Sequence, residues 1–278
     1  MLTKIEALDG FGNTLSLPLQ DVSAGYTVKS IDGLDPVKAT ISSSSFAQLD
    51  GAQFQGARRE PRNIIIKLGM EPYSGGSTVR TLRANLYKYF MPKAFVTLKF
   101  YDDGSSIPTA LITGQVETME TPLFAKDPEV NISILCADPA FYGPTELSVT
   151  GNTHDPSGAT DTTINYAGTL EVGYRLVIPV NRTMSTGLTV LLKRFGASVY
   201  EKVDITAALA NLDVVEISTL AKNKYVKNTK SPGSSLLYAV TVASRFAPLY
   251  PGVNYFRIDA SGAAVPWTLY YTPRYGGL

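Results

Sequence analysis

The chain has 278 residues, of which 18% are charged, and its formal net charge is +1. Its length suits one large domain or two ordinary domains with real hydrophobic cores, and a nearly neutral chain has no overall field that attracts nucleic acid or anionic lipid. The single cysteine excludes an intramolecular disulfide framework. No apolar run approaches the roughly 20 residues of a membrane helix, and the first residues lack the apolar core of a secretory signal. We therefore expect a soluble chain made in a cytoplasm, without membrane insertion.

The first predicted elements are a strand followed by a helix. The apolar run Ile64–Ile66 predicts a strand from Arg62 to Leu68. The helix is indicated by STVRTLRANLYKYFMP, in which apolar residues recur at helical spacing over positions 78–90. Ser77 or Thr78 is suited to cap its start, and Pro92 to end it.

Short β-type segments make up most of the remaining chain. VTLKFYDD (96–103) alternates apolar and polar residues, and VNISILCADP (130–139) places Ile132, Ile134 and Cys136 on one face. Six further segments are YRLVIPV, LTVLLKRF, LDVVEIST, LLYAVTVA, NYFRIDAS and WTLYYTP. Their spacing is typical of all-β sandwiches or barrels. The sequence therefore predicts a mainly β protein with one amphipathic helix near 78–90.

A domain boundary is expected after CADPAFYG (136–143). The following segment GNTHDPSGATDT (151–162) is polar and contains Gly, Pro and Ser, which is typical of linkers. We therefore predict two β-rich domains, residues 1–144 and residues 145–278.

No constellation of catalytic residues is visible. The only histidine, His154, has Asp155 and Ser157 as neighbours in one loop, whereas the members of a catalytic triad normally come from separate elements. Cys136 lies on an apolar strand face and reads as a small buried hydrophobe. One histidine and one cysteine support zinc poorly. We expect no enzyme activity, no cofactor and no metal site.

The densest charge lies in GARREPR, where Arg58, Arg59, Glu60 and Arg62 surround Pro61. Three interpretations are open: a solvated surface, a nucleic-acid patch, or a clamp on another subunit. Few aromatic residues interleave with these arginines, and the planar guanidinium suits bidentate pairing with carboxylates. We favour Arg58, Arg59, Glu60 and Arg62 as candidates for a subunit interface, in which the arginines pair with carboxylates of a neighbour.

A saccharide platform is the second candidate site. Trp267, Tyr270 and Tyr275 cluster near the end of the sequence, and sugar sites commonly use exposed aromatic rings. However, Trp267, Leu269 and Tyr271 alternate along one predicted strand, so core packing is the favoured interpretation for Trp267.

The order of these pieces resembles the distal tail proteins (Dit) of long-tailed phages. The resemblance spans nearly the whole sequence, and it depends on the order and spacing of short motifs. In chain order they are Gly33–Asp35, Leu49–Gly51, Gly56–Arg59, the strand and the helix, Asp102–Gly104, Cys136–Tyr142, Asn165–Thr169, Leu249–Asn254 and Tyr271–Tyr275.

The resemblance implies a structural hub with no catalytic function. Residues 1–144 would form a tail-tube-like β-barrel or sandwich with a flanking helix, and six copies would close into a ring. Residues 145–278 would form a galectin-like β-sandwich that faces outward. The ring would join the tail tube to the tail-tip hub and receptor-binding proteins of the virion, with the tape-measure protein among its neighbours, after assembly in the host cytoplasm. No specific nucleic-acid binding is expected. The alternatives are a saccharide-binding adsorption module and a tail-tube subunit.

Overall fold

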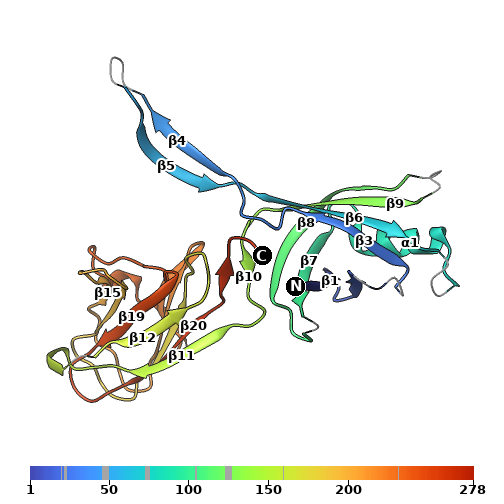
Figure 1. Ribbon diagram of the computed structural model, residues 1–278. Coiled ribbons are helices and arrows are strands. Elements are labelled where there is room, and N and C mark those ends of the chain that lie inside the picture. The colour runs from blue at the N-terminus through green and yellow to red at the C-terminus, as the bar shows by residue number, and fades with distance from the viewer. Residues whose placement is uncertain are drawn as a thin grey trace. The chain divides into compact units, whose positions relative to one another are not determined.

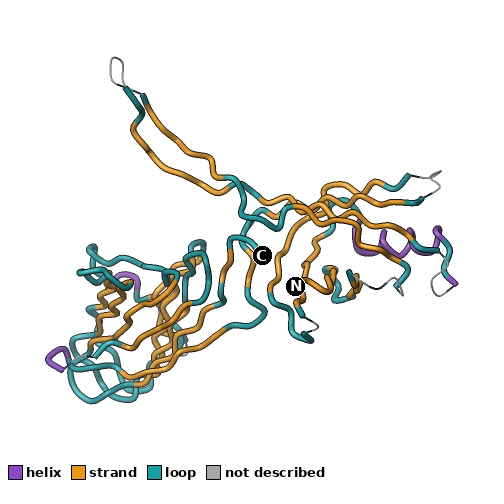
Figure 2. Tube along the Cα trace, in the orientation of Figure 1, coloured by secondary structure: helices purple, strands orange, loops and turns teal. Residues whose placement is uncertain are grey.

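The computed structural model describes residues 1–19, 21, 24–45, 50–72, 76–103, 105–122, 127–158, 160–230 and 232–278. These residues form two compact units, which Figures 1 and 2 show. Unit 1 contains Met1–Pro144 and Tyr275–Leu278, and unit 2 contains Thr145–Arg274. The last four residues thus belong to unit 1, whereas the sequence assigned them to the C-terminal domain. Leu49 and Gly104, which belong to two of the quoted motifs, lie outside the described residues.

Unit 1 is built on one large antiparallel sheet. Its main path runs β2-β1-β7-β8-β9-β6-β3, and the short strands β10 and β21 extend it beside β8. The strands are β1 (Leu2–Asp9), β2 (Thr14–Pro18), β3 (Tyr26–Asp32), β6 (Arg62–Met70), β7 (Phe95–Asp102), β8 (Ala110–Glu120), β9 (Glu129–Cys136), β10 (Phe141–Tyr142) and β21 (Arg274–Tyr275). The predicted inward face of β9 is confirmed, because Ile132, Ile134 and Cys136 are all fully buried.

One α-helix, α1 (Val79–Phe90), covers part of this sheet. The Thr78 hydroxyl accepts a hydrogen bond from the Thr81 backbone N–H, and the Thr81 hydroxyl accepts one from the Thr78 backbone N–H; together they form a capping box. Leu82, Leu86 and Phe90 are buried on one face. The predicted helix and its cap at Thr78 are therefore confirmed.

The strands β4 (Ala39–Ser44) and β5 (Gln53–Arg59) form a separate two-stranded sheet. In Figure 1 this hairpin extends from the rest of unit 1 as a ribbon. Within the described part of the chain, β4 and β5 pair only with each other. We call β4 and β5 together the assembly hairpin, after the role that we propose for it.

Unit 2 is a β-sandwich. One sheet has the order β11-β20-β13-β16-β17-β18, the other has the order β12-β19-β14-β15, and the side chains of both share one core. The strands are β11 (Leu147–Asn152), β12 (Thr162–Tyr166), β13 (Arg175–Pro179), β14 (Leu188–Arg194), β15 (Glu201–Ile205), β16 (Val214–Leu220), β17 (Asn223–Asn228), β18 (Ser234–Ser235), β19 (Gly252–Asp259) and β20 (Pro266–Tyr271); the 3-10 helices are η2 (Pro156–Gly158) and η3 (Leu237–Ala239).

Two local predictions in unit 2 are wrong. The segment LLYAVTVA (236–243) is not a strand: it forms η3 and then runs along β15, where the Thr241 N–H donates to the Asp204 carbonyl. The polar loop 151–162 is not a linker, because it begins inside β11 and the buried Thr153 hydroxyl accepts from the Val265 N–H. In both segments, backbone hydrogen bonds to neighbouring strands override the local composition.

Residues 64–66 provide a direct test of the core of unit 1. Ile64 and Ile66 are fully buried, whereas Ile65 is only half-buried on the opposite face of β6. We expect Ile66→Ala to lower the free energy of unfolding by ~2–5 kcal/mol, since it leaves a cavity in the core. Urea denaturation should show a clearly smaller loss for the matched control Ile65→Ala. Equal losses in the two variants would contradict this packing.

Candidate assembly interface

The assembly hairpin has one apolar face. The register pairs Ile41 with Ala57 and Ser43 with Phe54. Because directly opposed residues share a face and side chains alternate along a strand, one face carries four apolar residues together with Ser43 and Arg59: Ala39, Ile41, Ser43, Phe54, Ala57 and Arg59. The other face carries Thr40, Ser42, Gly56 and Arg58.

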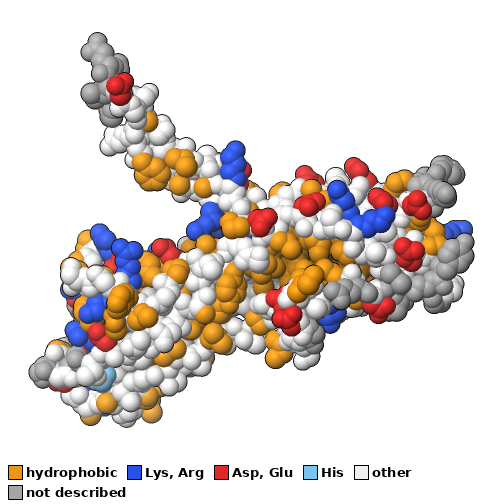
Figure 3. Space-filling view, viewed as in Figure 1, with side chains coloured by type: hydrophobic (Ala, Val, Ile, Leu, Met, Phe, Trp, Pro, Cys, Tyr) orange, Lys and Arg blue, Asp and Glu red, His pale blue; other side chains and the backbone are white. Residues whose placement is uncertain are grey.

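This apolar face is open to solvent. Ile41 is 66% exposed and Phe54 is 65% exposed. Figure 3 shows hydrophobic side chains gathered along the hairpin, with Lys and Arg side chains near its root. Each of its two strands also has a hydrogen-bonding edge that no other described strand pairs. A long, exposed ribbon with an apolar face and free edges is the kind of surface that another chain covers.

Three of the four predicted interface residues are exposed or half-buried at the root of this hairpin. Arg58 and Arg59 are exposed on opposite faces and form no salt bridge within the described residues. Glu60 is half-buried, and its Oε1 accepts a hydrogen bond of 2.6 Å from the Thr40 hydroxyl. The Glu60 N–H donates to the Lys38 carbonyl, which closes the hairpin at its root.

Arg62 lies at the same root but is buried, and the prediction that it pairs with a carboxylate of a neighbour is wrong. Its side chain is 1% exposed and belongs to the interior of unit 1. Nε donates to the Pro139 carbonyl at 2.8 Å, one terminal nitrogen donates to the Gly33 and Asp35 carbonyls, and the other donates to the Gly276 carbonyl at 2.6 Å. The guanidinium carbon lies 4.3 Å from the centroid of the Phe141 ring. We call these four carbonyls and this ring the Arg62 cage.

The Arg62 cage brings together motifs that are far apart in the sequence. Gly33 and Asp35 come from the motif after β3, and Pro139 and Phe141 come from CADPAFY. Burial lowers the pKa of the Arg62 guanidinium below its ordinary value. Carbonyl dipoles therefore stabilise a cation that water does not reach.

Two parts of the cage are held in place by their local surroundings. Gly33 has a φ of +90°, and a Cβ there would lie 2.1 Å from the Asn63 carbonyl oxygen, so only glycine fits. Asp138 accepts hydrogen bonds from the Ala140 N–H and, at 2.6 Å, from the Tyr142 hydroxyl. These bonds order the turn that presents the Pro139 carbonyl and the Phe141 ring to Arg62.

The predicted saccharide platform does not form. Trp267 is 1% exposed and packs in the core of unit 2, with its ring centroid 4.9 Å from that of Phe256. Tyr270 points to the opposite face of β20, where the Arg175 guanidinium lies 4.5 Å from its ring centroid. Tyr275 packs against the core of unit 1. Strand alternation separates Trp267 from Tyr270, as the core interpretation of Trp267 required.

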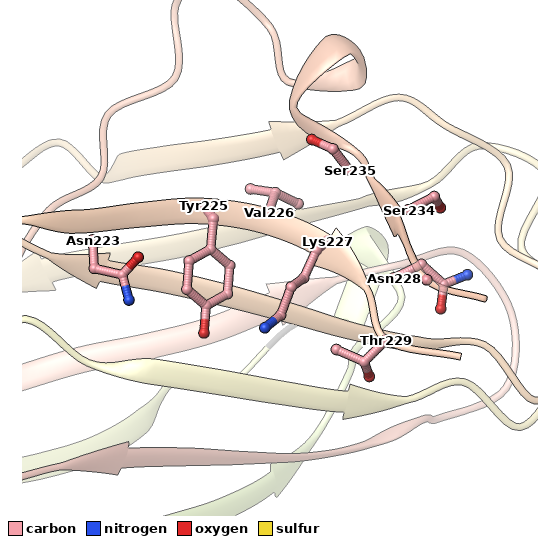
Figure 4. Close-up of a pocket in the computed structure, with 9 residues that line it drawn as sticks. Asn223, Tyr225, Val226, Lys227, Asn228, Thr229, Ser234 and Ser235 are labelled. Carbon is pink, nitrogen blue, oxygen red and sulfur yellow. The ribbon is translucent and has the colours of Figure 1, made fainter. Parts of the chain in front are cut away.

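Unit 2 instead has an open groove of about 740 Å³ beside β17 and β18 (Figure 4). Figure 4 shows the side chains of Asn223, Tyr225 and Lys227 on one side of β17. The complete lining is Asn223, Tyr225, Val226, Lys227, Asn228, Thr229, Gly233, Ser234 and Ser235. We call this surface the β17 groove.

Glu216 orders the floor of the β17 groove. The Tyr225 hydroxyl donates to Glu216 at 2.6 Å, and the Lys227 ammonium lies 3.2 Å from the same carboxylate and 4.3 Å from the Tyr225 ring centroid. Burial alone would raise the pKa of Glu216, but the bonds from Tyr225 and Lys227 outweigh it and lower that pKa. The carboxylate therefore stays ionised, and its charge compensates that of Lys227.

Residues weighed for chemistry occupy structural positions. Burial raises the pKa of the Cys136 thiol to about 11, so very little nucleophilic thiolate exists at neutral pH. His154 forms backbone hydrogen bonds with Ile258 and Ala260. Among the residues that the structure describes, no group of three or more His, Cys, Asp or Glu side chains could hold a metal ion. No helix in the described part of the chain is long and apolar enough to cross a membrane.

Comparison with solved structures identifies the architecture. The structure of the SPP1 Dit (gp 19.1) protein, described as a paradigm of the hub adsorption apparatus in phages that infect Gram-positive bacteria, aligns with a TM-score of 0.68 and 17% sequence identity over 97% of this chain and 98% of that chain. The chain has the distal tail protein fold. Both units take part in the match, because the alignment covers almost all of each chain.

Two further structural alignments are too weak to support a conclusion about the fold. Two chains from structures of the phage p2 baseplate in its activated conformation, with Ca and with Sr, align with TM-scores of 0.45 and 0.41 and identities of 12% and 10%. The first alignment covers 100% of both chains, and the second covers 96% of this chain and 97% of the other. No protein-family model and no curated protein sequence matches the chain.

Proposed function

We propose that the protein is a structural hub of a phage tail tip and that it assembles into a ring, with six subunits by its resemblance to distal tail proteins. The ring joins the tail tube to the tail-tip hub and receptor-binding proteins of the virion, next to the tape-measure protein, after assembly in the host cytoplasm. Unit 1 forms the ring and unit 2 faces outward. The protein acts without catalysis, cofactor or metal.

The apolar face of the assembly hairpin is the observation that carries this proposal. The hairpin is separate from the large sheet of unit 1, and Ile41 and Phe54 stay exposed within the protomer. We therefore assign a second copy of the chain as the partner that covers them. Each large side chain that becomes fully buried contributes about 1.5–3 kcal/mol. A hairpin on one copy and a different surface on the next make a heterologous contact, which closes into a ring when the rotation between copies permits it.

The fold supports this function over a simple tail-tube subunit. The alignment with SPP1 Dit, a hub protein, includes unit 2 as well as unit 1. A tube subunit requires only a domain of the unit 1 type.

The apolar face generates the first assembly prediction. We expect the native protein to form rings at micromolar concentration, and Phe54→Asp to shift the population to monomers because it places a charge on the buried face of the hairpin. Native mass spectrometry with negative-stain images measures this. Ser42→Asp, on the opposite face, is the matched control and should retain rings. Monomers in the native protein, or equal losses in both variants, would contradict the proposed contact.

Arg58 and Arg59 generate the second assembly prediction. We propose that they pair with carboxylates of the adjacent subunit, and breaking a desolvated pair from one side costs ~2–5 kcal/mol of association. The double variant Arg58→Ala/Arg59→Ala should therefore weaken the rings while the protomer stays folded. The same variant should be titrated with an oligonucleotide at two salt concentrations. The interface interpretation would be wrong if the native protein bound the oligonucleotide with a salt-dependent affinity and the double variant lost this affinity while its rings stayed intact. The arginines would then form a nucleic-acid site.

The β17 groove favours a second candidate function, which is the binding of a neutral saccharide by unit 2. The groove combines the Tyr225 ring with amide and hydroxyl side chains, and Glu216 compensates the charge of Lys227. An aromatic ring with hydrogen-bonding neighbours suits a sugar, whose C–H face packs on the ring while its hydroxyls bind the polar groups.

This candidate has its own test. Chitotetraose and maltotetraose should each be titrated against the protein by NMR, and binding at about 1 mM or tighter should be lost in Tyr225→Ala. Tyr238, 81% exposed and outside the groove, provides the control Tyr238→Ala. If neither sugar shifts the β17 and β18 signals, or if both variants lose binding equally, the groove is not a saccharide site.

A further inference from the structure

The Arg62 cage lies at the root of the assembly hairpin. Gly33 and Asp35 belong to the segment between β3 and β4, through which the chain enters the hairpin. Arg62 is the first residue of β6, so it immediately follows the segment through which the chain leaves the hairpin. One guanidinium therefore joins both sides of the root. Because β4 and β5 pair with no other described strand, these contacts tie the root of the hairpin to the rest of unit 1.

The C-terminal tail, Tyr275–Leu278, completes this cage. The Gly276 carbonyl accepts from Arg62, and the Leu278 N–H donates to the Leu34 carbonyl at 3.1 Å. A Cβ on Gly277 would lie 2.9 Å from the Pro36 side chain and 3.1 Å from the Leu34 carbonyl oxygen, so the tail lies directly on the entering segment. Removing the tail from this position would leave an Arg62 donor without its carbonyl and uncover one side of the root.

We propose that Arg62 is the positioning residue of the assembly hairpin and that it holds the hairpin root in its assembly-competent conformation only while the C-terminal tail is docked. Arginine is required because its donors point in several fixed directions in one plane and reach four carbonyls at once. A lysine keeps the charge but presents its donors from a single nitrogen, and it cannot replace these bonds. The proposal rests on the proposed function, in which the hairpin forms the contact between subunits.

A purely structural role for Arg62 makes a different prediction. If the residue only stabilises unit 1, its loss should loosen the whole sheet, and a change in the tail should act independently of it. If Arg62 and the tail hold the hairpin root together, loss of either should loosen the same local segment, and loss of both should add little. Local hydrogen exchange separates these cases because it reports opening region by region.

The experiment uses full-length protein with Arg62→Lys, Gly277→Val and both substitutions. Hydrogen exchange is followed by mass spectrometry in the hairpin root (residues 34–39 and 58–63) and in the core strands β7 and β8, and ring formation is followed by native mass spectrometry. We expect each single variant to accelerate exchange at the root about tenfold or more, the factor that corresponds to ~1.4 kcal/mol, with little change in β7 and β8. The double variant should resemble the single variants, and rings should require correspondingly higher protein concentration.

Three results would overturn the proposal: unchanged root exchange in Gly277→Val, additive effects in the double variant, or equal acceleration in β7 and β8. If Arg62→Lys fails to fold, Gly277→Val decides alone, because it leaves the guanidinium in place. Lys38→Arg, which changes an exposed side chain at the same root outside both the cage and the proposed ion pairs, is the matched control and should leave exchange unchanged. If the native protein forms no rings, the proposed function fails, whereas the exchange measurements still decide whether Arg62 and the tail lock the root.

Discussion

A single buried cation organises unit 1. Arg62 cannot lose its proton at any ordinary pH, so its burial is tolerated only where neighbouring dipoles replace the water that it has lost. Four backbone carbonyls from three separate parts of the chain do so, and the Phe141 ring closes one face. Each partner in turn requires a local conformation, such as the positive φ of Gly33 or the Asp138 turn. Short motifs that look unrelated in the sequence therefore all help to stabilise the buried charge of Arg62.

The assembly hairpin depends on this arrangement because it has no core of its own. Isolated two-stranded hairpins are marginally stable in water at best. The ribbon gains its order from the root, where Glu60 and Lys38 close it and Arg62 binds the segment that enters it. The hydrogen-bonded root thus ends at the point where the exposed apolar face begins. A hairpin with a hydrogen-bonded root and an exposed apolar face is suited to bind another molecule.

Much of the fold could be predicted from the sequence, and particular residues show why the rest could not. The helix 79–90 and the inward face of β9 follow from strong periodicity, and the structure has both. Alternation would also have placed Arg62 inside, since Arg62, Ile64 and Ile66 share one face of β6; the density of charge in GARREPR concealed this signal. The apolar face of the hairpin could not be found without the register, because the bulge between Ser42 and Ser43 shifts the pairing, so that Phe54 lies opposite Ser43 and on the same face as Ile41. The return of Tyr275–Leu278 to unit 1 leaves no local signal, since it is decided by carbonyls and a guanidinium more than two hundred residues apart.

The path of the chain also determines which part of this architecture can vary. Unit 2 is an insertion within unit 1, because unit 1 resumes after Arg274. Its points of departure and return lie side by side, since β10 pairs with β21. Insertions are tolerated best where the two ends of the inserted segment lie close together, because the host then keeps its own backbone contacts. Unit 1 can therefore accept a larger, smaller or different inserted domain between β10 and β21, while its sheet, the Arg62 cage and the assembly hairpin remain the same. The surface of unit 2 can therefore diversify independently of the part that we propose builds the ring.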